Sequence, residues 1–131
     1  MKSLGIKVAL IDDSPIIRNC MQDIISLWGY VVVLEAVNGK DLFRKLTKAN
    51  APDICITDIN MPEMNGYETI AVLKEKWPEI KIIAFSIANN KKDEERALAA
   101  GAHAFVSKLS SITVLQKVLQ SMKQPAKSGY K

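Results

Sequence analysis

Hydrophobic and polar positions divide this chain into two kinds of stretch that alternate. Short continuous runs of aliphatic residues, typical of strands buried on both faces, are each followed by a longer stretch with apolar residues at helical spacing. The pattern occurs five times. The predicted strands are Ile6–Ile11, Val31–Glu35, Asp53–Thr57, Lys81–Ser86 and His103–Ser107.

Residues that favour helix caps precede the predicted helices. The helices are expected after Ser14 to Trp28, after Asn38 to Ala49, from Asn65 or Gly66 to Trp77, from Lys91 to Ala100, and after Ser110 or Ser111 to Met122. In the first helix the apolar positions are Ile16, Ile17, Cys20, Met21, Ile24, Ile25 and Trp28. The helix Lys91–Ala100 has only a thin apolar stripe, so we expect its packing to be the weakest.

Repeated strand–helix units predict an α/β fold with a parallel sheet and helices on both faces. We expect the flavodoxin-like, doubly wound (βα)5 architecture with strand order 2-1-3-4-5, which places the first and third strands side by side. The 131 residues fit one domain, predicted over residues 1–123. Residues 124–131 are polar and are predicted to form a mobile tail or the start of a linker.

Composition and charge narrow the function classes. The net charge is +4, but Lys123, Lys127 and Lys131 lie in the last nine residues, and removing those three charges leaves +1. A nucleic-acid footprint is therefore weak. No apolar stretch is long enough to cross a bilayer, and the chain starts without a visible secretory signal, which favours the cytoplasm. The only cysteines, Cys20 and Cys55, are expected to be buried, reduced thiols.

Three carboxylates end two of the predicted strands. Asp12 and Asp13 close the first apolar run, and Asp58 closes the third. In open α/β sheets, the carboxyl edge of the strands is where ligands bind. Like charges that share a pocket repel one another, so such a cluster tends to hold protons or a cation. Because hard oxygen ligands suit Mg²⁺, the sequence predicts a magnesium site, and such sites commonly handle phosphate.

Two further polar groups end predicted strands near the same edge. Ser86 closes the fourth strand, and Lys108 follows the fifth. A hydroxyl and an ammonium beside a metal–carboxylate cluster suit the oxygens of a phosphoryl group. A carboxylate is also a competent nucleophile toward phosphorus, and its product is an aspartyl phosphate.

These motifs resemble those of the receiver domain of bacterial two-component response regulators, over essentially residues 6 to 122. The resemblance rests on the acid pair, on the stretch from Asp58 to Gly66, on Ser86 and on Lys108, in that order. The segment from Lys108 to Ser111 is similar to the subfamily whose regulators carry a LuxR-type helix-turn-helix. That output domain is absent here, so we expect either a piece of a longer regulator or a stand-alone receiver.

The resemblance implies a role for each site residue. Asp58 would be the phosphoacceptor, and Asp12 and Asp13 would hold Mg²⁺ together with Asp58 and the backbone carbonyl of Asn60. Ser86 and Lys108 would bind the phosphoryl oxygens. A further residue, Phe105, matches the family's switch aromatic, which moves inward when the hydroxyl residue is drawn to the phosphate.

The resemblance also implies partners. The donor would be a histidine kinase or a phosphotransfer protein, and phosphorylation would switch the surface formed by the fourth helix, the fifth strand and the fifth helix. A phosphorylation-dependent homodimer is plausible, DNA would be reached only through the absent output domain, and no membrane contact is expected. The chain is not expected to be an enzyme beyond accepting a phosphoryl group and hydrolysing it.

Several positions depart from the family pattern, among them Leu109 and Ile87. Leu109 stands where most receivers have a proline in a cis peptide, and we expect the Lys108–Leu109 bond to be trans because a non-proline cis bond costs about 3–4 kcal/mol. Ile87 stands where many receivers have a small residue. We expect it to crowd the phosphoryl pocket, and to slow both the reaction with small phosphodonors and self-hydrolysis.

Two other function classes compete with a receiver. A Mg²⁺-dependent phosphohydrolase of the haloacid dehalogenase type would also use an Asp nucleophile, but its acids follow the first strand in a D-x-D arrangement. Here the pair is adjacent, and the candidate nucleophile Asp58 follows the third strand. A nucleotide-binding domain ranks last, because no glycine-rich loop follows the first strand.

Overall fold

The fold is built on one five-stranded sheet. The structure, a computed structural model, describes residues 5–87 and 90–122, so the predicted tail at 124–131 lies outside the described residues. The strands pair in parallel in the order β2-β1-β3-β4-β5. This order confirms the predicted flavodoxin-like architecture. The strands are β1 (Lys7–Ile11), β2 (Val31–Ala36), β3 (Ile54–Thr57), β4 (Lys81–Ser86) and β5 (Ala104–Ser107).

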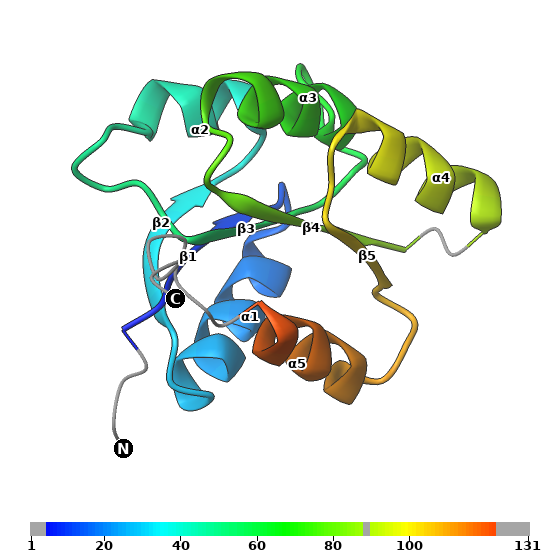
Figure 1. The fold of residues 1–131 in the computed structure, drawn as a ribbon. Coiled ribbons are helices and arrows are strands. Elements are labelled where there is room, and N and C mark those ends of the chain that lie inside the picture. Colours follow the sequence, from blue (N-terminus) through cyan, green and yellow to red (C-terminus); the bar gives the residue numbers. More distant parts are fainter. Residues whose placement is uncertain (1–4, 88–89, 123–131) are drawn as a thin grey trace, which may run out of the picture.

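Helices cover both faces of the sheet. In Figure 1, α2, α3 and α4 lie on one face, and α1 and α5 lie on the other. Side-chain caps at the helix N-termini are formed by the expected residues, including Ser14, Asn38, Asn65 and Ser111. The helices are α1 (Pro15–Leu27), α2 (Gly39–Lys45), α3 (Gly66–Lys76), α4 (Lys91–Ala100) and α5 (Ile112–Ser121).

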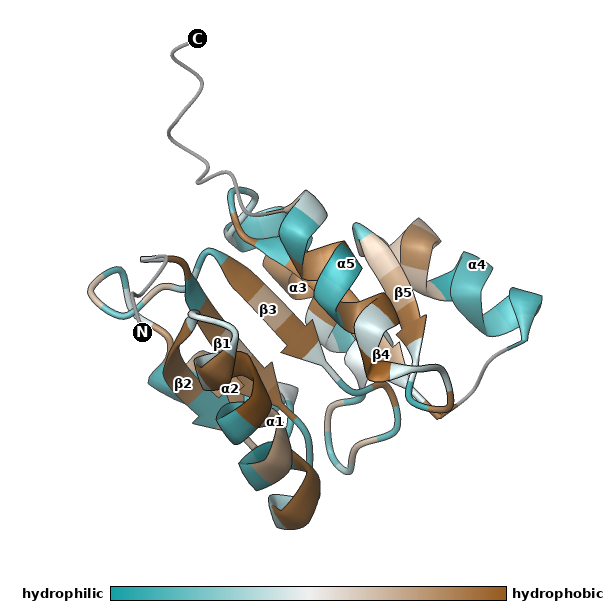
Figure 2. Ribbon diagram, turned by 90° about the horizontal axis from the view of Figure 1, so that it is seen from below, coloured by the Kyte–Doolittle hydropathy of each residue, from teal (hydrophilic) through white to brown (hydrophobic). Residues whose placement is uncertain are grey.

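Two hydrophobic clusters, one on each face of the sheet, form the core. Alternate residues of a strand point to opposite faces, so Ala9 and Ile11 of β1 join one cluster, and Val8 and Leu10 join the other. The apolar colouring of the central strands in Figure 2 reflects this double burial. Because both faces are covered, the strands read as continuous apolar runs, and this is why the sequence predicted them well.

Helix α2 is shorter than predicted. It ends at Lys45 and not at Ala49, because Leu46 already has an extended backbone conformation. The side chain of Asn50 donates to the carbonyl of Lys45 at 2.9 Å and accepts from the amide of Thr47 at 2.7 Å. The asparagine therefore satisfies backbone groups at the helix end and competes with further helical turns.

The prediction that both cysteines are buried is wrong for Cys20. Cys55 is buried in β3, and burial raises the pKa of its thiol to about 12. Cys20 is exposed on α1, as is Ile16, whose exposed fraction is 75%. These two residues are four apart and share a face of the helix next to the buried stripe of Met21 and Ile25, so helical spacing alone gave an apolar face that was too wide.

Helix α4 is the least buried of the helices, as predicted. Ala97 is its one buried residue among those described. Polar and ring contacts help to hold it against α3: the Tyr67 hydroxyl donates to Asp93 at 3.4 Å, and the Arg96 guanidinium lies 4.0 Å from the centre of the Tyr67 ring. With one buried residue, α4 has little apolar packing that would resist a shift.

Two further observations concern the whole described region. All of its peptide bonds are trans, which confirms the prediction for the bond between Lys108 and Leu109. A search of the described residues finds no helix with the length and apolar character needed to span a bilayer.

Candidate functional site

Strand pairing brings the predicted acids together at the carboxyl edge of the sheet. Ile11, the last residue of β1, lies beside Thr57, the last residue of β3. The amide of Asp58 donates to the carbonyl of Ile11 at 2.8 Å, and the amide of Asp12 donates to the carbonyl of Ala36 at 3.0 Å. The backbone hydrogen bonds of the sheet therefore continue one residue beyond β1 and β3, and they hold the main chain of Asp12 and Asp58 in place.

The three acids form one cluster. Asp12, Asp13 and Asp58 each offer a carboxylate oxygen, and these oxygens all lie within 4.8 Å of one another. Oxygens bound to octahedral Mg²⁺ at 2.0–2.1 Å lie about 3 Å apart when adjacent and about 4.2 Å apart when opposite. Small side-chain rotations would bring these atoms into that range. The donor set, composed of hard oxygens only, fits Mg²⁺.

Lys108 provides the positive charge in this cluster. Its ammonium lies 2.7 Å from Oδ2 of Asp12 and 3.4 Å from Oδ1 of Asp58. The side chains of all three residues are largely buried, which strengthens these interactions relative to a surface pair. The amide of Lys108 donates to the carbonyl of Ser86 at 2.7 Å, so the end of β5 is tied to the end of β4.

The carboxyl group of Asp58 has an unusual environment. Burial raises its pKa above the usual value for aspartate; the nearby Lys108 opposes this shift, and the neighbouring charge of Asp12 adds to it. The amide of Ile59 donates to its Oδ1 at 2.7 Å. This hydrogen bond and the contact with Lys108 orient the carboxylate toward the cluster.

A cavity of about 240 Å³ opens over the acids. Its lining includes Asp12, Asp13, Asp58, Asn60 and Lys108, five of the predicted site residues. The side chain of Ile87 also lines it and is 61% exposed, at the position where we predicted crowding.

Two predicted residues lie outside this lining. Ser86 is buried at the end of β4, directly before Ile87, and Phe105 is half-buried on β5. The Phe105 ring packs against the hydrophobic cluster on the face covered by α2, α3 and α4.

The loop after Asp58 is tightly packed against α3. The amide of Gly66 donates to the carbonyl of Ile59 at 2.7 Å. A Cβ atom at position 66 would lie 2.3 Å from the carbonyl oxygen of Asp58, so only glycine fits without moving the site. Asn65, directly before Gly66, forms a capping box with Glu68 at the start of α3.

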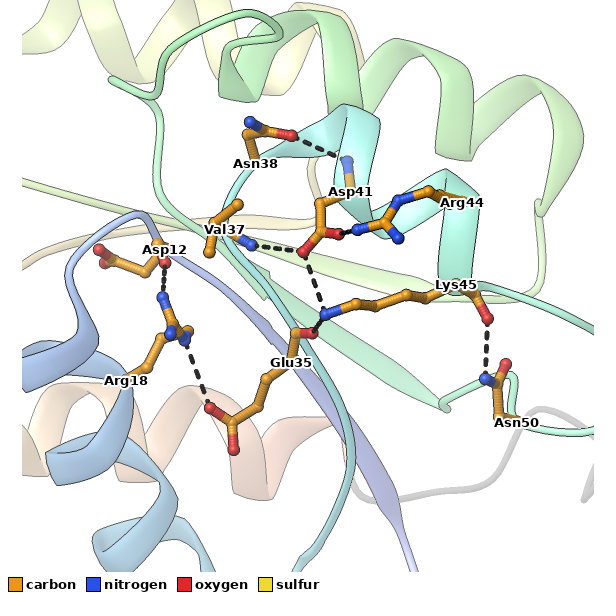
Figure 3. Close-up of polar contacts among 9 residues, drawn as sticks. All are labelled: Asp12, Arg18, Glu35, Val37, Asn38, Asp41, Arg44, Lys45 and Asn50. Atoms are coloured by element: carbon orange, nitrogen blue, oxygen red, sulfur yellow. Dashed lines mark hydrogen bonds and ion pairs between the residues drawn. The ribbon is translucent and has the colours of Figure 1, made fainter.

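One polar residue beside the cluster, Arg18, was not singled out from the sequence. Its guanidinium donates to the backbone carbonyl of Asp12 at 2.6 Å and lies 3.3 Å from the Glu35 carboxylate (Figure 3). A signal was present: Arg18 is the only basic residue between Pro15 and Leu27. It also stands near the N-terminus of its helix, where the helix dipole disfavours a cation.

Comparison with known proteins shows the family of this chain. The family model described as the response regulator receiver domain matches residues 8–120. The chain is 37% identical over 102 residues to the nitrate/nitrite response regulator protein NarL of Escherichia coli K12, covering 77% of this chain and 47% of NarL. It is 38% identical over 105 residues to the chemotaxis protein CheY of Thermotoga maritima, covering 80% of this chain and 87% of CheY. The chain thus spans about half the length of NarL.

Solved structures show the same likeness. A LuxR-family two-component response regulator from Aurantimonas sp. superimposes with a TM-score of 0.84 at 27% identity, covering 91% of this chain and 85% of that one. The CheX–CheY–BeF3–Mg complex of Borrelia burgdorferi gives a TM-score of 0.79 at 25% identity and 88% coverage of both chains. The LuxR-family match agrees with the subfamily resemblance of the sequence. This chain belongs to the response regulator receiver domain family.

Proposed function

We propose that this chain is the phosphoacceptor receiver of a two-component system, and that Asp58 takes a phosphoryl group from a histidine kinase or a phosphotransfer protein in a Mg²⁺-dependent reaction. The observation that carries the proposal is the convergence of Asp58, the acid pair and Lys108 at one edge of the sheet, beneath an open cavity.

In the transfer step, a carboxylate oxygen of Asp58 attacks phosphorus. The P–O bond forms as the P–N bond of the donor phosphohistidine breaks, and the departing imidazole nitrogen keeps the electron pair. Lys108 stabilises the charge on the phosphoryl oxygens, and the hydroxyl of Ser86 donates to one of them. When bound to Asp12, Asp13, Asp58 and the carbonyl of Asn60, Mg²⁺ supplies neutralising charge.

The switch would follow from the same contacts. Drawing Ser86 and Lys108 toward the phosphoryl group pulls on the ends of β4 and β5, with α4 between them in the chain. Helix α4 has one buried residue among those described, so it yields before the better packed helices do. We therefore propose that α4, β5 and α5 form the output surface and that Phe105 moves inward with the hydroxyl.

Two consequences concern partners. Leu98 of α4, and Ile112 and Val114 of α5, are exposed apolar residues on this output surface, and they could be covered in a phosphorylation-dependent homodimer. DNA would be contacted only by an output domain in a longer protein. Since the family consists of signalling modules rather than classical enzymes, the phosphohydrolase alternative is not favoured.

The decisive experiment is intact mass spectrometry after incubation with a small phosphodonor and Mg²⁺. Wild type should gain the mass of one phosphoryl group, and Asp58→Asn, an almost isosteric control, should gain none. A chain that never gains the group, or a variant that gains it equally, contradicts the assignment of Asp58.

The switch needs a separate measurement. Amide hydrogen exchange with and without the phosphoryl group should change across residues 86–108 and stay constant in β1. Unchanged exchange across that segment contradicts the proposed output surface while leaving the phosphoacceptor assignment intact.

A further inference from the structure

Arg18 lies beside the acid cluster and is not part of the lining of the cavity over it. Its side chain is 16% exposed and helps to line a small interior void together with Asp12 and Asp58. The guanidinium bridges two groups that belong to different strands, the carbonyl of Asp12 after β1 and the carboxylate of Glu35 in β2 (Figure 3).

The bond to the Asp12 carbonyl has a geometric consequence. This carbonyl belongs to the peptide group that joins Asp12 to Asp13, and a peptide group is planar. Fixing its oxygen at 2.6 Å from a guanidinium nitrogen therefore fixes the direction in which the chain leaves toward Asp13. The Asp12 side chain is held separately, because its Oδ1 accepts from the amide of Ser14 at 2.9 Å and its Oδ2 pairs with Lys108.

The position of Arg18 has an electrostatic cost. A cation near the first turn of a helix is opposed by the helix dipole, and burial removes much of its hydration. Glu35 offsets part of this cost, since its carboxylate lies 3.3 Å from Nε and is itself partly buried, with 32% of its side chain exposed. The arrangement holds a charged donor at a backbone carbonyl in spite of this cost.

We propose that Arg18 is a positioning residue for the metal site: it fixes the peptide between Asp12 and Asp13, with Glu35 as its counter-ion, so that the two acids present their oxygens to Mg²⁺ together. This inference rests on the proposed function. It assigns Arg18 no contact with the metal or the phosphoryl group.

A positioning role and a purely electrostatic role predict opposite results. If Arg18 acted only through its charge, removing that charge would reduce repulsion and tighten Mg²⁺ binding. If Arg18 positions the peptide, its removal weakens Mg²⁺ binding, and groups that orient metal ligands typically contribute about 10-fold or more in affinity.

The test measures Mg²⁺ affinity by calorimetry, and the rate of phosphorylation by a small phosphodonor as Mg²⁺ is varied. Arg18→Met should weaken Mg²⁺ binding about 10-fold and shift the Mg²⁺ midpoint of the rate by the same factor. The rate at saturating Mg²⁺ should change much less. Glu35→Gln should have a smaller effect in the same direction, because its amide oxygen still accepts from Nε.

Arg44→Met is the matched control. Arg44 also pairs with an aspartate, Asp41, but its side chain is 74% exposed on α2 and lines no part of the cavity over the acids. Mg²⁺ affinity should be unchanged in this variant. Arg18→Lys, which keeps the charge with a different donor geometry, decides the question if Arg18→Met does not fold, and it should also bind Mg²⁺ more weakly than wild type.

Mg²⁺ affinity that is unchanged or higher in the folded Arg18 variants overturns the positioning role. A wild-type chain that neither binds Mg²⁺ nor gains a phosphoryl group contradicts the proposed function itself. The two failures are therefore distinguishable, since the first leaves the wild-type behaviour intact.

Discussion

The ammonium of Lys108 lies 2.7 Å from Oδ2 of Asp12, although 96 residues separate them in the sequence. The contact joins the end of β5 to the end of β1 across the carboxyl edge of the sheet. The lysine thus occupies an oxygen that is also a candidate metal ligand, so the lysine and a cation compete for the same carboxylate.

This competition gives a prediction for Lys108→Met. Mg²⁺ should bind several-fold more tightly, because Asp12 and Asp58 lose their positive neighbour. Phosphorylation at saturating Mg²⁺ should nevertheless slow by about 100-fold, since the group that stabilises charge on the phosphoryl oxygens is gone. Calorimetry and a phosphorylation time course separate the two effects. Weaker Mg²⁺ binding in the variant would show that the lysine supports the metal site.

Replacing Gly66 by alanine should displace the loop that carries Asp58, although Gly66 itself does not line the cavity. The added methyl group meets the Asp58 carbonyl and the Ile59 backbone at 2.3 and 2.6 Å, so the loop must move. We expect the free energy of unfolding to fall by about 3 kcal/mol, measured by urea denaturation, together with slower phosphorylation. A control at exposed Ala71 in α3, Ala71→Ser, should change both far less. Wild-type stability in Gly66→Ala contradicts the close approach.

Shortening Ile87 should open the cavity. The side chain lines the cavity beside Asn60 and Lys108, so Ile87→Ala should raise the rate of phosphorylation by a small phosphodonor several-fold, and raise self-hydrolysis as well. Loss of the phosphoryl group can be followed by intact mass over time. Leu109→Ala, which removes an equally exposed apolar side chain that is not part of the cavity lining, is the control. Rates that stay constant or fall in Ile87→Ala rule out crowding.

Asp41 should make the stability of the fold pH-dependent. Burial tends to raise the pKa of its carboxyl group, but the hydrogen bond from the Val37 amide and the pairs with Lys45 and Arg44 outweigh this and lower it below the usual 3.8 (Figure 3). A lowered pKa contributes stability above about pH 3.8 that is lost as pH falls further.

The matching substitution is Asp41→Asn, which keeps an oxygen acceptor and removes the charge. It should lower the free energy of unfolding by about 1 kcal/mol at pH 7. The difference from wild type should shrink as pH falls below about 3.8, because the wild-type carboxylate then gains a proton. Urea denaturation at several pH values measures this difference in the free energy of unfolding. A difference that grows toward low pH contradicts the prediction.

The sequence predicted the sheet, its order and the residues that meet at its edge, because buried parallel strands leave an unambiguous apolar pattern and their ends are marked by acids. Helices were less certain. The end of α2 depends on the side chain of Asn50 reaching back to Lys45. The exposure of Cys20 depends on which side of α1 packs into the core, and that side is the one with Met21 and Ile25. Neither feature changes the apolar spacing along the chain.

The contact between Arg18 and the Asp12 carbonyl could not be predicted for a related reason. A backbone carbonyl carries no residue identity, so no pair of residue types in the sequence marks the interaction. The one hint in the sequence is that Arg18 is an isolated basic residue near the start of a helix, where the helix dipole disfavours a cation. Side chains that act through the main chain are thus the hardest to find from a sequence.

The four residues of β3 are buried, and the strand lies in the middle of the sheet with a partner on each side. Asp58 thus directly follows a fully buried central strand. Helix α4, in contrast, lies at the edge of the fold, and its exposed residues are mostly charged. The outer side of α4 can therefore be substituted without disturbing the atoms around Asp58, and under the proposed function such substitutions would change the output partner alone.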